Sequence, residues 1–385
     1  MLSDPYSPGR IPSVLAGRGD ELSVARGALG PVSLGRAAGP LVAFYGARGV
    51  GKTSLLRAVQ REAAEATFLT AWVTGRPDER LIVGLANSLA QALRDAHLES
   101  RSRVLAQRIE KVRVEVGVPG AKVGAELRTG GDDVPPTLEA LLEDAARFAR
   151  SHARPGLVVF VDELQDAPLE DRRSLLIALQ HLDGALQGCP VAVLAAGLPS
   201  LPAAVTDAAT FGERSTFVPV GALGAVAVAE ALRLPAAAAS VAWSDEAVDA
   251  CVEESRGYAY KVQLLGSAAW AAAGPRAAGD QVLLPHVRRA VDDVDRQMRT
   301  MFAARLAKTN GEERRLLRAL AEVVDDDGVA SRGAAASTLG VPSTALSRPR
   351  QALIDKGLLE VADRGTLRFT IPGFDRYLKE HVEDD

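Results

Sequence analysis

A glycine-rich segment close to residue 50 constrains the fold of this chain more than any other feature. It matches the pattern G-x-x-x-x-G-K-[ST] through Gly46, Ala47, Arg48, Gly49, Val50, Gly51, Lys52 and Thr53. An apolar run of strand type at residues 41–45 precedes it, and a segment with helical spacing begins at Ser54. In this context glycines let backbone N–H groups curl around phosphate oxygens, and the helix turns its positive N-terminus toward the same anion. The segment predicts a phosphate-binding loop in an α/β domain.

The scarcity of lysine strengthens this interpretation. Only seven lysines accompany 38 arginines in the 385 residues, and one of them stands in the motif. A chance match somewhere in a chain of this composition has odds of about one in 200, so a glycine-rich turn without a ligand is the weaker alternative. Lys52 would reach the β- and γ-phosphates of ATP, the Thr53 hydroxyl would ligate Mg²⁺, and Ser54 would complete the nucleotide-binding set.

Two adjacent carboxylates follow a second apolar run, at residues 157–161. Asp162 and Glu163 come about 110 residues after the phosphate loop, at the kind of strand end where open α/β sheets bind ligands. Asp162 would hold Mg²⁺ through water, and Glu163 would orient and polarise the water that attacks the γ-phosphate. The adjacent glutamate favours hydrolysis over phosphoryl transfer to a metabolite.

The hydrophobic pattern predicts the fold class of residues 41–220. Further apolar runs at 68–74 and 191–196 alternate with helical stretches at 79–96, 137–152 and 171–186. Unbroken apolar strands between helices indicate a parallel sheet covered on both faces, which is a three-layer α/β domain. Period-two alternation on both sides of Pro119-Gly120 predicts an inserted β-hairpin over residues 111–127. This hairpin either contacts a partner through Lys111, Arg113 and Lys122 or packs as an edge ornament.

The remaining residues divide into an arm, a lid and a last domain. Residues 1–40 form an arm with one helix at 20–29. Residues 221–304 predict an all-α lid, with helices at 223–234, 244–255, 258–273 and 285–307. Residues 305–385 predict helices at 312–324, 331–339 and 347–356, then two strands at 358–361 and 366–371 and a final helix at 374–381. Three helices followed by a hairpin are typical of a winged helix.

Four further stretches combine with the phosphate loop into a family pattern. They are Leu15-Ala16-Gly17-Arg18 ahead of Glu21-Leu22, Val161-Asp162-Glu163-Leu164-Gln165-Asp166, Ala195-Ala196-Gly197-Leu198-Pro199 and Gly257-Tyr258-Ala259-Tyr260. Over nearly its whole length the chain resembles the AAA+ ATPases, more closely the bacterial ATPases near the origin-recognition initiators and the STAND signalling ATPases. The resemblance implies an AAA+ core that binds ATP and Mg²⁺ between core and lid, and a nucleotide-dependent homo-oligomer.

The resemblance also suggests roles for three cations. Arg18 belongs to the box that frames the adenine. Arg214 follows the fourth strand and its helix, where AAA+ proteins place an arginine finger that acts on a neighbouring subunit; the alternative is a surface pair with Glu213. Lys261 lies one place beyond the position of the lid's sensor arginine, and it either contacts the γ-phosphate or is a solvated surface lysine.

One departure from the family concerns the end of the fourth strand. AAA+ proteins usually carry a polar sensor there that positions the attacking water, whereas this chain has Ala195, Ala196 and Gly197. We therefore expect slow turnover. The sequence supports an ATP-hydrolysing switch with a winged-helix output domain, and it leaves open a regulatory scaffold that binds ATP or ADP with little turnover and acts through protein contacts.

The partner of the last domain stays open between double-stranded DNA and a protein. A net charge of −4 provides no whole-protein attraction for nucleic acid or anionic membrane, so DNA contact needs a local patch. The candidates on the third helix and the wing are Ser347, Arg348, Arg350, Gln351, Lys356, Arg364 and Arg368. Two cysteines, no signal-peptide pattern and no apolar run of membrane-spanning length favour a cytoplasmic protein without a membrane partner.

Overall fold

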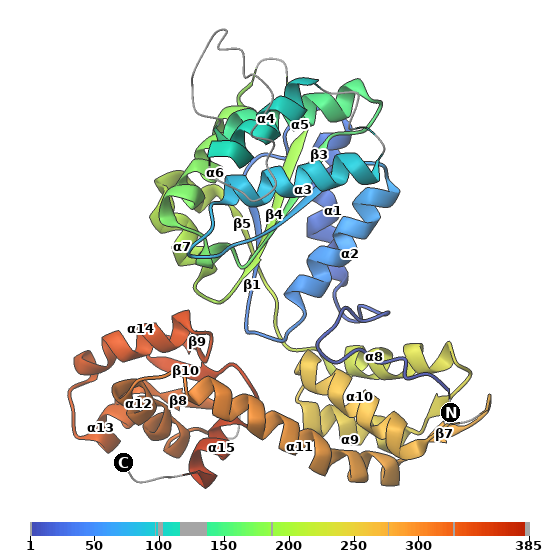
Figure 1. Ribbon diagram of the computed structural model, residues 1–385. Helices are drawn as coiled ribbons and strands as arrows, with labels where there is room; N and C mark the ends of the chain where they lie inside the picture. Colours follow the sequence, from blue (N-terminus) through green and yellow to red (C-terminus); the bar gives the residue numbers. More distant parts are fainter. Residues whose placement is uncertain are drawn as a thin grey trace.

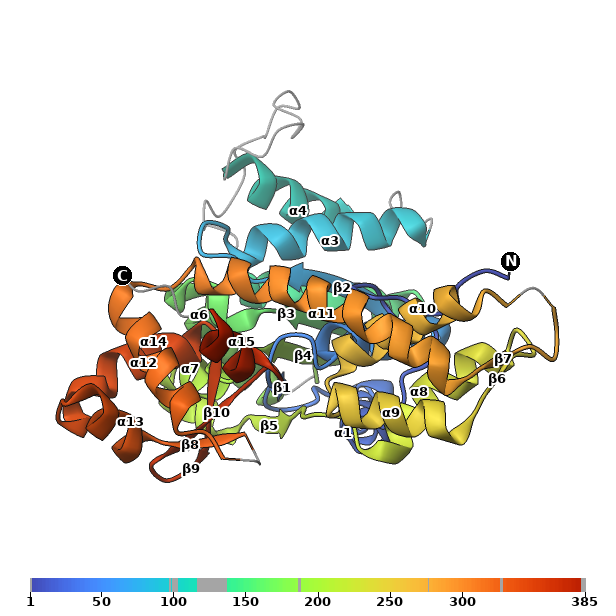
Figure 2. The same ribbon diagram turned by 90° about the horizontal axis from the view of Figure 1, so that it is seen from below.

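The computed structural model has three parts, an α/β core, a helical lid and a C-terminal domain. It describes residues 2–96, 98, 103–115, 137–185, 188–275, 277–325 and 328–381. An α/β core lies above a helical lid and a C-terminal domain, and the long helix α11 (Leu284–Leu306) runs from the lid into the C-terminal domain (Figures 1 and 2). No helix in the described ranges is long and apolar enough to cross a membrane.

The core is built on a parallel sheet of five strands. They are β1 (Val42–Tyr45), β2 (Leu69–Thr74), β3 (Leu157–Asp162), β4 (Val191–Gly197) and β5 (Thr216–Pro219), in the order β2-β3-β4-β1-β5. The sequence did not indicate β5. Because β4 lies between β1 and β3, its carboxyl end lies between the phosphate loop and Asp162.

Helices cover both faces of this sheet, which confirms the expected three layers. One face packs against α1 (Gly19–Ser33) and α2 (Lys52–Glu65). The other packs against α3 (Leu81–Asp95), α5 (Leu138–Ser151), α6 (Leu169–Asp183) and α7 (Leu201–Ala208). Side chains of β3 alternate between the two cores: Val158 and Phe160 join the first, and Val159 and Val161 join the second. Burial on both faces explains why the strands are unbroken apolar runs.

The expected hairpin at 111–127 is wrong in its first strand. Lys111 and Arg113 lie in helix α4 (Arg103–Glu115), which packs against α3 and α5. Figure 2 shows α4 on the outer side of α3. Leu105, Ile109 and Val112 are buried at helical spacing, so this apolar stripe determined the local structure rather than the valine alternation. Lys122 and the rest of the expected hairpin, from residue 116 on, lie outside the described residues.

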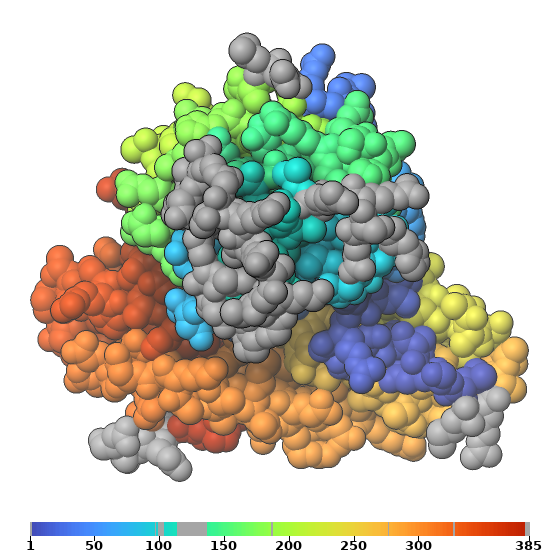
Figure 3. Space-filling model, turned by 45° about the horizontal axis from the view of Figure 1, so that its top comes forward, coloured from blue at the N-terminus to red at the C-terminus, as the bar shows by residue number. Residues whose placement is uncertain are grey.

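The lid consists of α8 (Ala225–Ala237), α9 (Asp245–Ser255), α10 (Ala259–Ala273) and the first part of α11. It is helical as expected, with one addition, a parallel pair of two-residue strands, β6 (Ala242–Trp243) and β7 (Gln281–Val282). The N-terminal segment packs against this lid (Figure 3). Tyr6 is buried there; its hydroxyl donates to the Leu232 carbonyl at 2.6 Å and accepts from Trp243 Nε1 at 2.8 Å. The arm therefore joins core and lid.

The C-terminal domain contains helices α12 (Gly311–Glu322), α13 (Arg332–Leu339), α14 (Ser347–Asp355) and α15 (Phe374–Glu380). Its antiparallel sheet has the order β8-β10-β9, formed by β8 (Val329–Ser331), β9 (Leu359–Asp363) and β10 (Thr366–Phe369). Strand β8 and a short 3-10 helix at Ser343–Leu346 were not expected. Phe302 of α11 stacks on Phe374 of α15 with ring centroids 5.2 Å apart, so α11 is packed into this domain as well as into the lid.

Candidate nucleotide site

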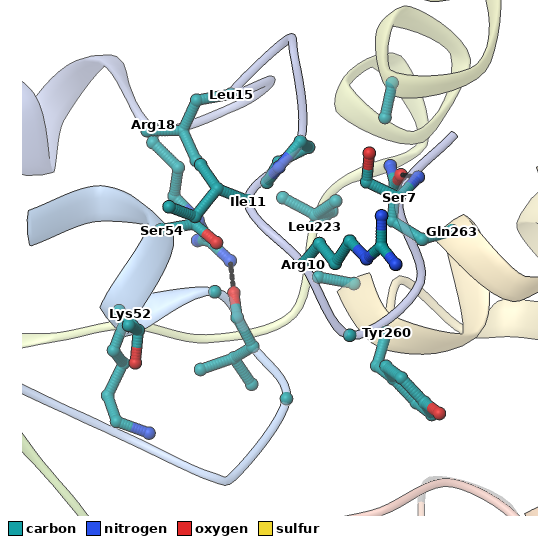
Figure 4. A pocket seen from close by; sticks show the side chains of 18 of the residues that line it. Ser7, Arg10, Ile11, Leu15, Arg18, Lys52, Ser54, Leu223, Tyr260 and Gln263 are labelled. Carbon is teal, nitrogen blue, oxygen red and sulfur yellow. Dashed lines mark hydrogen bonds between the residues drawn. The ribbon is translucent and has the colours of Figure 1, made fainter. Parts of the chain in front are cut away.

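A cavity of about 440 Å³ lies where the N-terminal segment, the phosphate loop and the lid meet. Ile11 and Leu15 of the N-terminal segment lie on one side of it, and Leu223, Tyr260 and Gln263 lie on the other (Figure 4). Lys52, Thr53, Ser54 and Glu163 also line it. An apolar compartment that continues into a polar end fits a nucleotide, whose base is flat and apolar and whose phosphates are charged.

The backbone of the loop at residues 46–53 has the shape that its glycines predict. Gly49 and Gly51 have φ angles of +84° and +102°, in the left-handed region that favours glycine. A Cβ at Gly46 would lie 2.2 Å from the Val220 carbonyl oxygen, whereas a Cβ at Gly51 would meet no atom within 4 Å. The loop is thus closed toward the protein at Gly46 and open at Gly51, where α2 begins and its first N–H groups are available to an anion.

Lys52 is buried and bonded to its own loop. Its Nζ donates to the carbonyl oxygens of Gly46 at 2.9 Å and Ala47 at 2.7 Å. Burial lowers the pKa of Lys52 to about 8, while the carboxylates of Glu163 and Asp162 act in the opposite direction. An ammonium held in this way at the polar end of the cavity is placed to meet phosphate oxygens.

This lowered pKa predicts pH-dependent nucleotide binding. Phosphates favour the charged lysine, and in the free protein Lys52 loses its proton as the pH rises through about 8. We expect the dissociation constant for ADP to be flat below that pH and to rise about tenfold per pH unit above it. Calorimetric titrations between pH 7 and pH 9.5 measure the effect. In Lys52→Arg the cation stays charged, so a slope equal to that of the wild type would contradict the assignment.

Thr53 and Asp162 approach each other at the carboxyl edge of the sheet. The Thr53 hydroxyl donates to Asp162 Oδ2 at 2.9 Å, and burial raises the pKa of Asp162. A hydroxyl beside a carboxylate fits Mg²⁺, which binds few protein oxygens and keeps water and phosphate oxygens as its other ligands. The described part of the chain has no group of three or more His, Cys, Asp and Glu side chains that could hold a metal by itself.

Glu163 follows Asp162 in a left-handed conformation, with φ +50° and ψ +43°. Its Oε2 accepts a hydrogen bond from Gln165 Nε2 at 2.8 Å, and Gln165 Oε1 accepts one from the Leu198 backbone N–H at 3.1 Å. The sequence analysis assigned no role to Gln165. Its position two residues after Glu163 could have indicated one, because the tight turn from Leu164 to Asp166 brings the Gln165 side chain back toward Glu163.

The comparison with known families agrees with this geometry. Residues 14–194 match the AAA ATPase domain family. Residues 299–378 match a family described as a domain of unknown function, DUF8462. No curated protein matches the chain significantly.

Among solved structures, the Walker-type ATPase PABY2304 of Pyrococcus abyssi is similar, with 14% identity, a TM-score of 0.62, and coverage of 95% of this chain and 96% of that one. The fold is therefore shared over nearly the whole length. Cdc6p of Pyrobaculum aerophilum has 14% identity, 99% coverage of both chains and a TM-score of 0.47. The RuvB Holliday junction branch migration motor of Thermotoga maritima has 16% identity, 96% coverage of both chains and a TM-score of 0.47.

Arg18 belongs to the segment that matches the AAA ATPase domain family, and its buried side chain connects three parts of the protein. One of its guanidinium nitrogens, Nη2, donates to the carbonyl oxygens of Val50 at 2.9 Å (Figure 4) and Gly221 at 2.7 Å, and Nη1 pairs with Glu21 at 3.1 Å. It lines the cavity and ties together the phosphate loop, α1 and the passage into the lid. Arg18 thus holds these walls of the cavity together.

Lys261 and Arg214 lie apart from the loop. Lys261 Nζ pairs with Glu254 at 3.4 Å and Asp295 at 3.5 Å, between lid helices, and it is not among the residues that line the cavity. Arg214 is exposed just before β5. Because β5 runs parallel to β1, Arg214 lies at the edge of the sheet opposite the phosphate loop. It has no ion pair with Glu213 among the interactions of the described residues.

The lid holds the phosphate loop through two tyrosines at the start of α10. The Tyr258 hydroxyl donates to the Arg48 carbonyl at 2.9 Å, and the Tyr260 N–H donates to the Gly49 carbonyl at 3.1 Å. A Cβ at Gly49 would lie 2.2 Å from the Tyr258 hydroxyl, so only glycine permits this approach. Any rearrangement of the loop around a ligand therefore acts directly on the lid.

Proposed function

We propose that this protein binds ATP with Mg²⁺ and hydrolyses it slowly to ADP and phosphate, as a switch. The observation that most supports this proposal is the Thr53–Asp162 hydrogen bond of 2.9 Å, because it joins the end of the phosphate loop to the carboxylate at the end of β3. Glu163 and Lys52 line the same cavity. The cation, the metal-binding oxygens and the base that ATP hydrolysis needs are thereby gathered in one place.

Each side chain then has a distinct task. Lys52 leaves the loop carbonyls for the β- and γ-phosphates and offsets their charge. Thr53 and Asp162 hold Mg²⁺, which when bound neutralises charge that develops on the phosphate oxygens. Glu163 orients the attacking water and takes its proton. Arg18 keeps the adenine end of the cavity in shape.

Two further cations have conditional roles in this proposal. Arg214 acts across subunits in a nucleotide-dependent homo-oligomer, since its own phosphate loop lies at the other edge of the sheet. Lys261 reaches a γ-phosphate only if the lid moves and its pairs with Glu254 and Asp295 open. For this reason we assign Lys261 to the packing of the lid.

Release of phosphate from ATP decides between the switch and a regulatory scaffold. The switch requires Mg²⁺-dependent release of phosphate from ATP by the wild type, lost when the metal is chelated. A regulatory scaffold would also bind ATP or ADP, but it would release no phosphate from ATP. The absence of a polar side chain at Ala195 and Ala196 favours slow turnover, so single-turnover measurements at enzyme excess are the suitable assay.

The C-terminal domain is proposed as a winged-helix output domain with a protein partner. Several of its candidate DNA contacts are engaged within the protein: Lys356 Nζ pairs with Glu313 at 2.5 Å, Arg368 pairs with Glu360 at 3.6 Å, and Gln351 bonds Asp355 at 3.0 Å. Arg348, Arg364 and Arg368 are exposed, and of these Arg368 is the one paired with Glu360. Two exposed arginines without an ion pair among the described residues provide few contacts for a phosphate backbone.

Salt dependence tests this choice of partner. We expect duplex DNA to bind weakly, with an affinity that falls only about tenfold when salt rises from about 50 to about 200 mM, because about two cations would contact phosphates. Fluorescence anisotropy with labelled duplex measures it, in the presence of ADP and of a slowly hydrolysed ATP analogue. A loss of about 1,000-fold over the same range would indicate six or more phosphate contacts and would reverse the assignment in favour of DNA.

A further inference from the structure

Gln165 makes two hydrogen bonds that connect separate parts of the site. Its Nε2 donates to Glu163 Oε2 at 2.8 Å, and its Oε1 accepts from the Leu198 N–H at 3.1 Å. The backbone N–H fixes which end of the amide faces β4, so the NH₂ end must face the carboxylate. One side chain thus holds Glu163 against the end of β4.

The glutamine occupies the space that β4 leaves empty. A Cβ at Gly197 would lie 2.0 Å from Gln165 Oε1, so any larger residue at Gly197 would expel the amide. The Gly197 carbonyl also accepts the Gly46 N–H at 3.2 Å, which places this point beside the start of the phosphate loop. A polar group therefore stands at the end of β4 after all, supplied by the neighbouring turn.

The C-terminal domain contacts the same point from outside. A Cβ at Gly357, in the turn between α14 and β9, would lie 3.0 Å from Leu198 Cδ2. Leu198 is only 1% exposed, and Gly357 is buried. The turn is held firmly, because the Gly357 carbonyl accepts from Thr370 Oγ1 at 2.7 Å and its N–H donates to the Ile354 carbonyl at 2.8 Å. Figure 1 shows α14 on the side of this domain that faces the core.

We propose that Gln165 is a positioning residue for Glu163. We also propose that its hydrogen bond to the Leu198 N–H links the orientation of the Glu163 carboxylate to the contact between Leu198 and Gly357 of the C-terminal domain. When Gly357 rests on Leu198, the Leu198 N–H holds the amide and the amide holds the carboxylate. When the domain leaves, Leu198 can shift and Glu163 loses its orientation. The proposal rests on the proposed ATP hydrolysis for its effect on rate, whereas the link itself exists without nucleotide.

Two substitutions at Gln165 separate its donor from its acceptor. Gln165→Met is of similar size and removes both hydrogen bonds; Gln165→Glu keeps an acceptor for Leu198 but sets a like charge against Glu163. We expect both to lower kcat about tenfold or more with KM for ATP little changed, because a hydrogen bond to a charged group is lost. Hydrogen exchange at the Leu198 amide should accelerate in Gln165→Met and stay slow in Gln165→Glu.

A matched pair of glycines tests the link to the C-terminal domain. Gly357 and Gly340 have φ angles of +65° and +64°, and a Cβ at Gly340 would meet no atom within 4 Å. Asparagine tolerates this conformation, so Gly357→Asn and Gly340→Asn carry similar backbone strain. Only Gly357→Asn pushes on Leu198. We expect it to accelerate exchange at the Leu198 amide and to lower kcat, while Gly340→Asn leaves both unchanged.

The outcomes discriminate between the two proposals. Wild-type kcat in both Gln165 variants overturns the positioning role, and identical behaviour of the two glycine variants overturns the link. Absence of turnover in the wild type overturns the proposed hydrolysis and the positioning role with it. The exchange measurements need no nucleotide, so in that case they still support or overturn the link between Leu198 and the C-terminal domain.

Discussion

Lys52→Ala is expected to lower ATP affinity at least about 100-fold, which corresponds to about 3 kcal/mol for a lost charged hydrogen-bond donor to phosphate. The substitution removes the only lysine that lines the described cavity. It leaves the carbonyl oxygens of Gly46 and Ala47 without their Lys52 donor, and because Lys52 itself lines the cavity, water that enters in its place should satisfy them and the fold should persist. Displacement of a fluorescent ADP analogue at pH 7 measures the affinity, and circular dichroism checks the fold.

The control for this prediction removes the same charge elsewhere. Lys379 is exposed on α15, in the C-terminal domain, so Lys379→Ala should bind ATP as the wild type does. Lys261→Ala is the informative third variant. Because Lys261 pairs with Glu254 and Asp295, we expect this variant to bind ATP with unchanged affinity. A loss of affinity comparable to that of Lys52→Ala would instead identify Lys261 as a phosphate ligand. Equal losses in all three variants would show that net charge, and not the loop, controls binding.

The sequence was sufficient to predict the strands that are buried on both faces of the sheet. The strands β1, β3 and β4 lie between two helical layers, so their residues are almost uniformly apolar and the pattern has one interpretation. The phosphate loop was predictable for a different reason. Its glycines are required by positive φ angles at Gly49 and Gly51, and that requirement is visible in a single sequence.

Edges and long-range contacts limited the prediction. The edge strand β5 is half-exposed and ends in proline, so it has no apolar run to detect. The pairing of Lys261 with Asp295 joins residues from different lid helices, and the Arg18 bond to Gly221 joins residues about 200 positions apart. Such contacts exist only after the chain has folded. The same is true of Gln165, whose importance depends on β4 lying beside β3.

Glu163→Gln is expected to stop hydrolysis and leave ATP binding intact. Glutamine has the shape of glutamate, and its side-chain oxygen can still accept the hydrogen bond from Gln165 Nε2, so the left-handed turn at residue 163 should be retained. What is lost is the base that takes the proton of the attacking water. General-base catalysis contributes about 10²- to 10⁴-fold, so kcat should fall by that factor. Single-turnover hydrolysis and nucleotide displacement measure rate and affinity on the same sample.

A carboxylate outside the site provides the comparison for this variant. Glu170 is exposed in the first turn of α6, and Glu170→Gln removes the same charge without touching the cavity, so its rate should equal that of the wild type. Hydrolysis by Glu163→Gln at the wild-type rate would remove Glu163 from the chemistry. A parallel fall in affinity and rate would instead assign the carboxylate to ATP or Mg²⁺ binding, since a base acts in the transition state and not in the bound ground state.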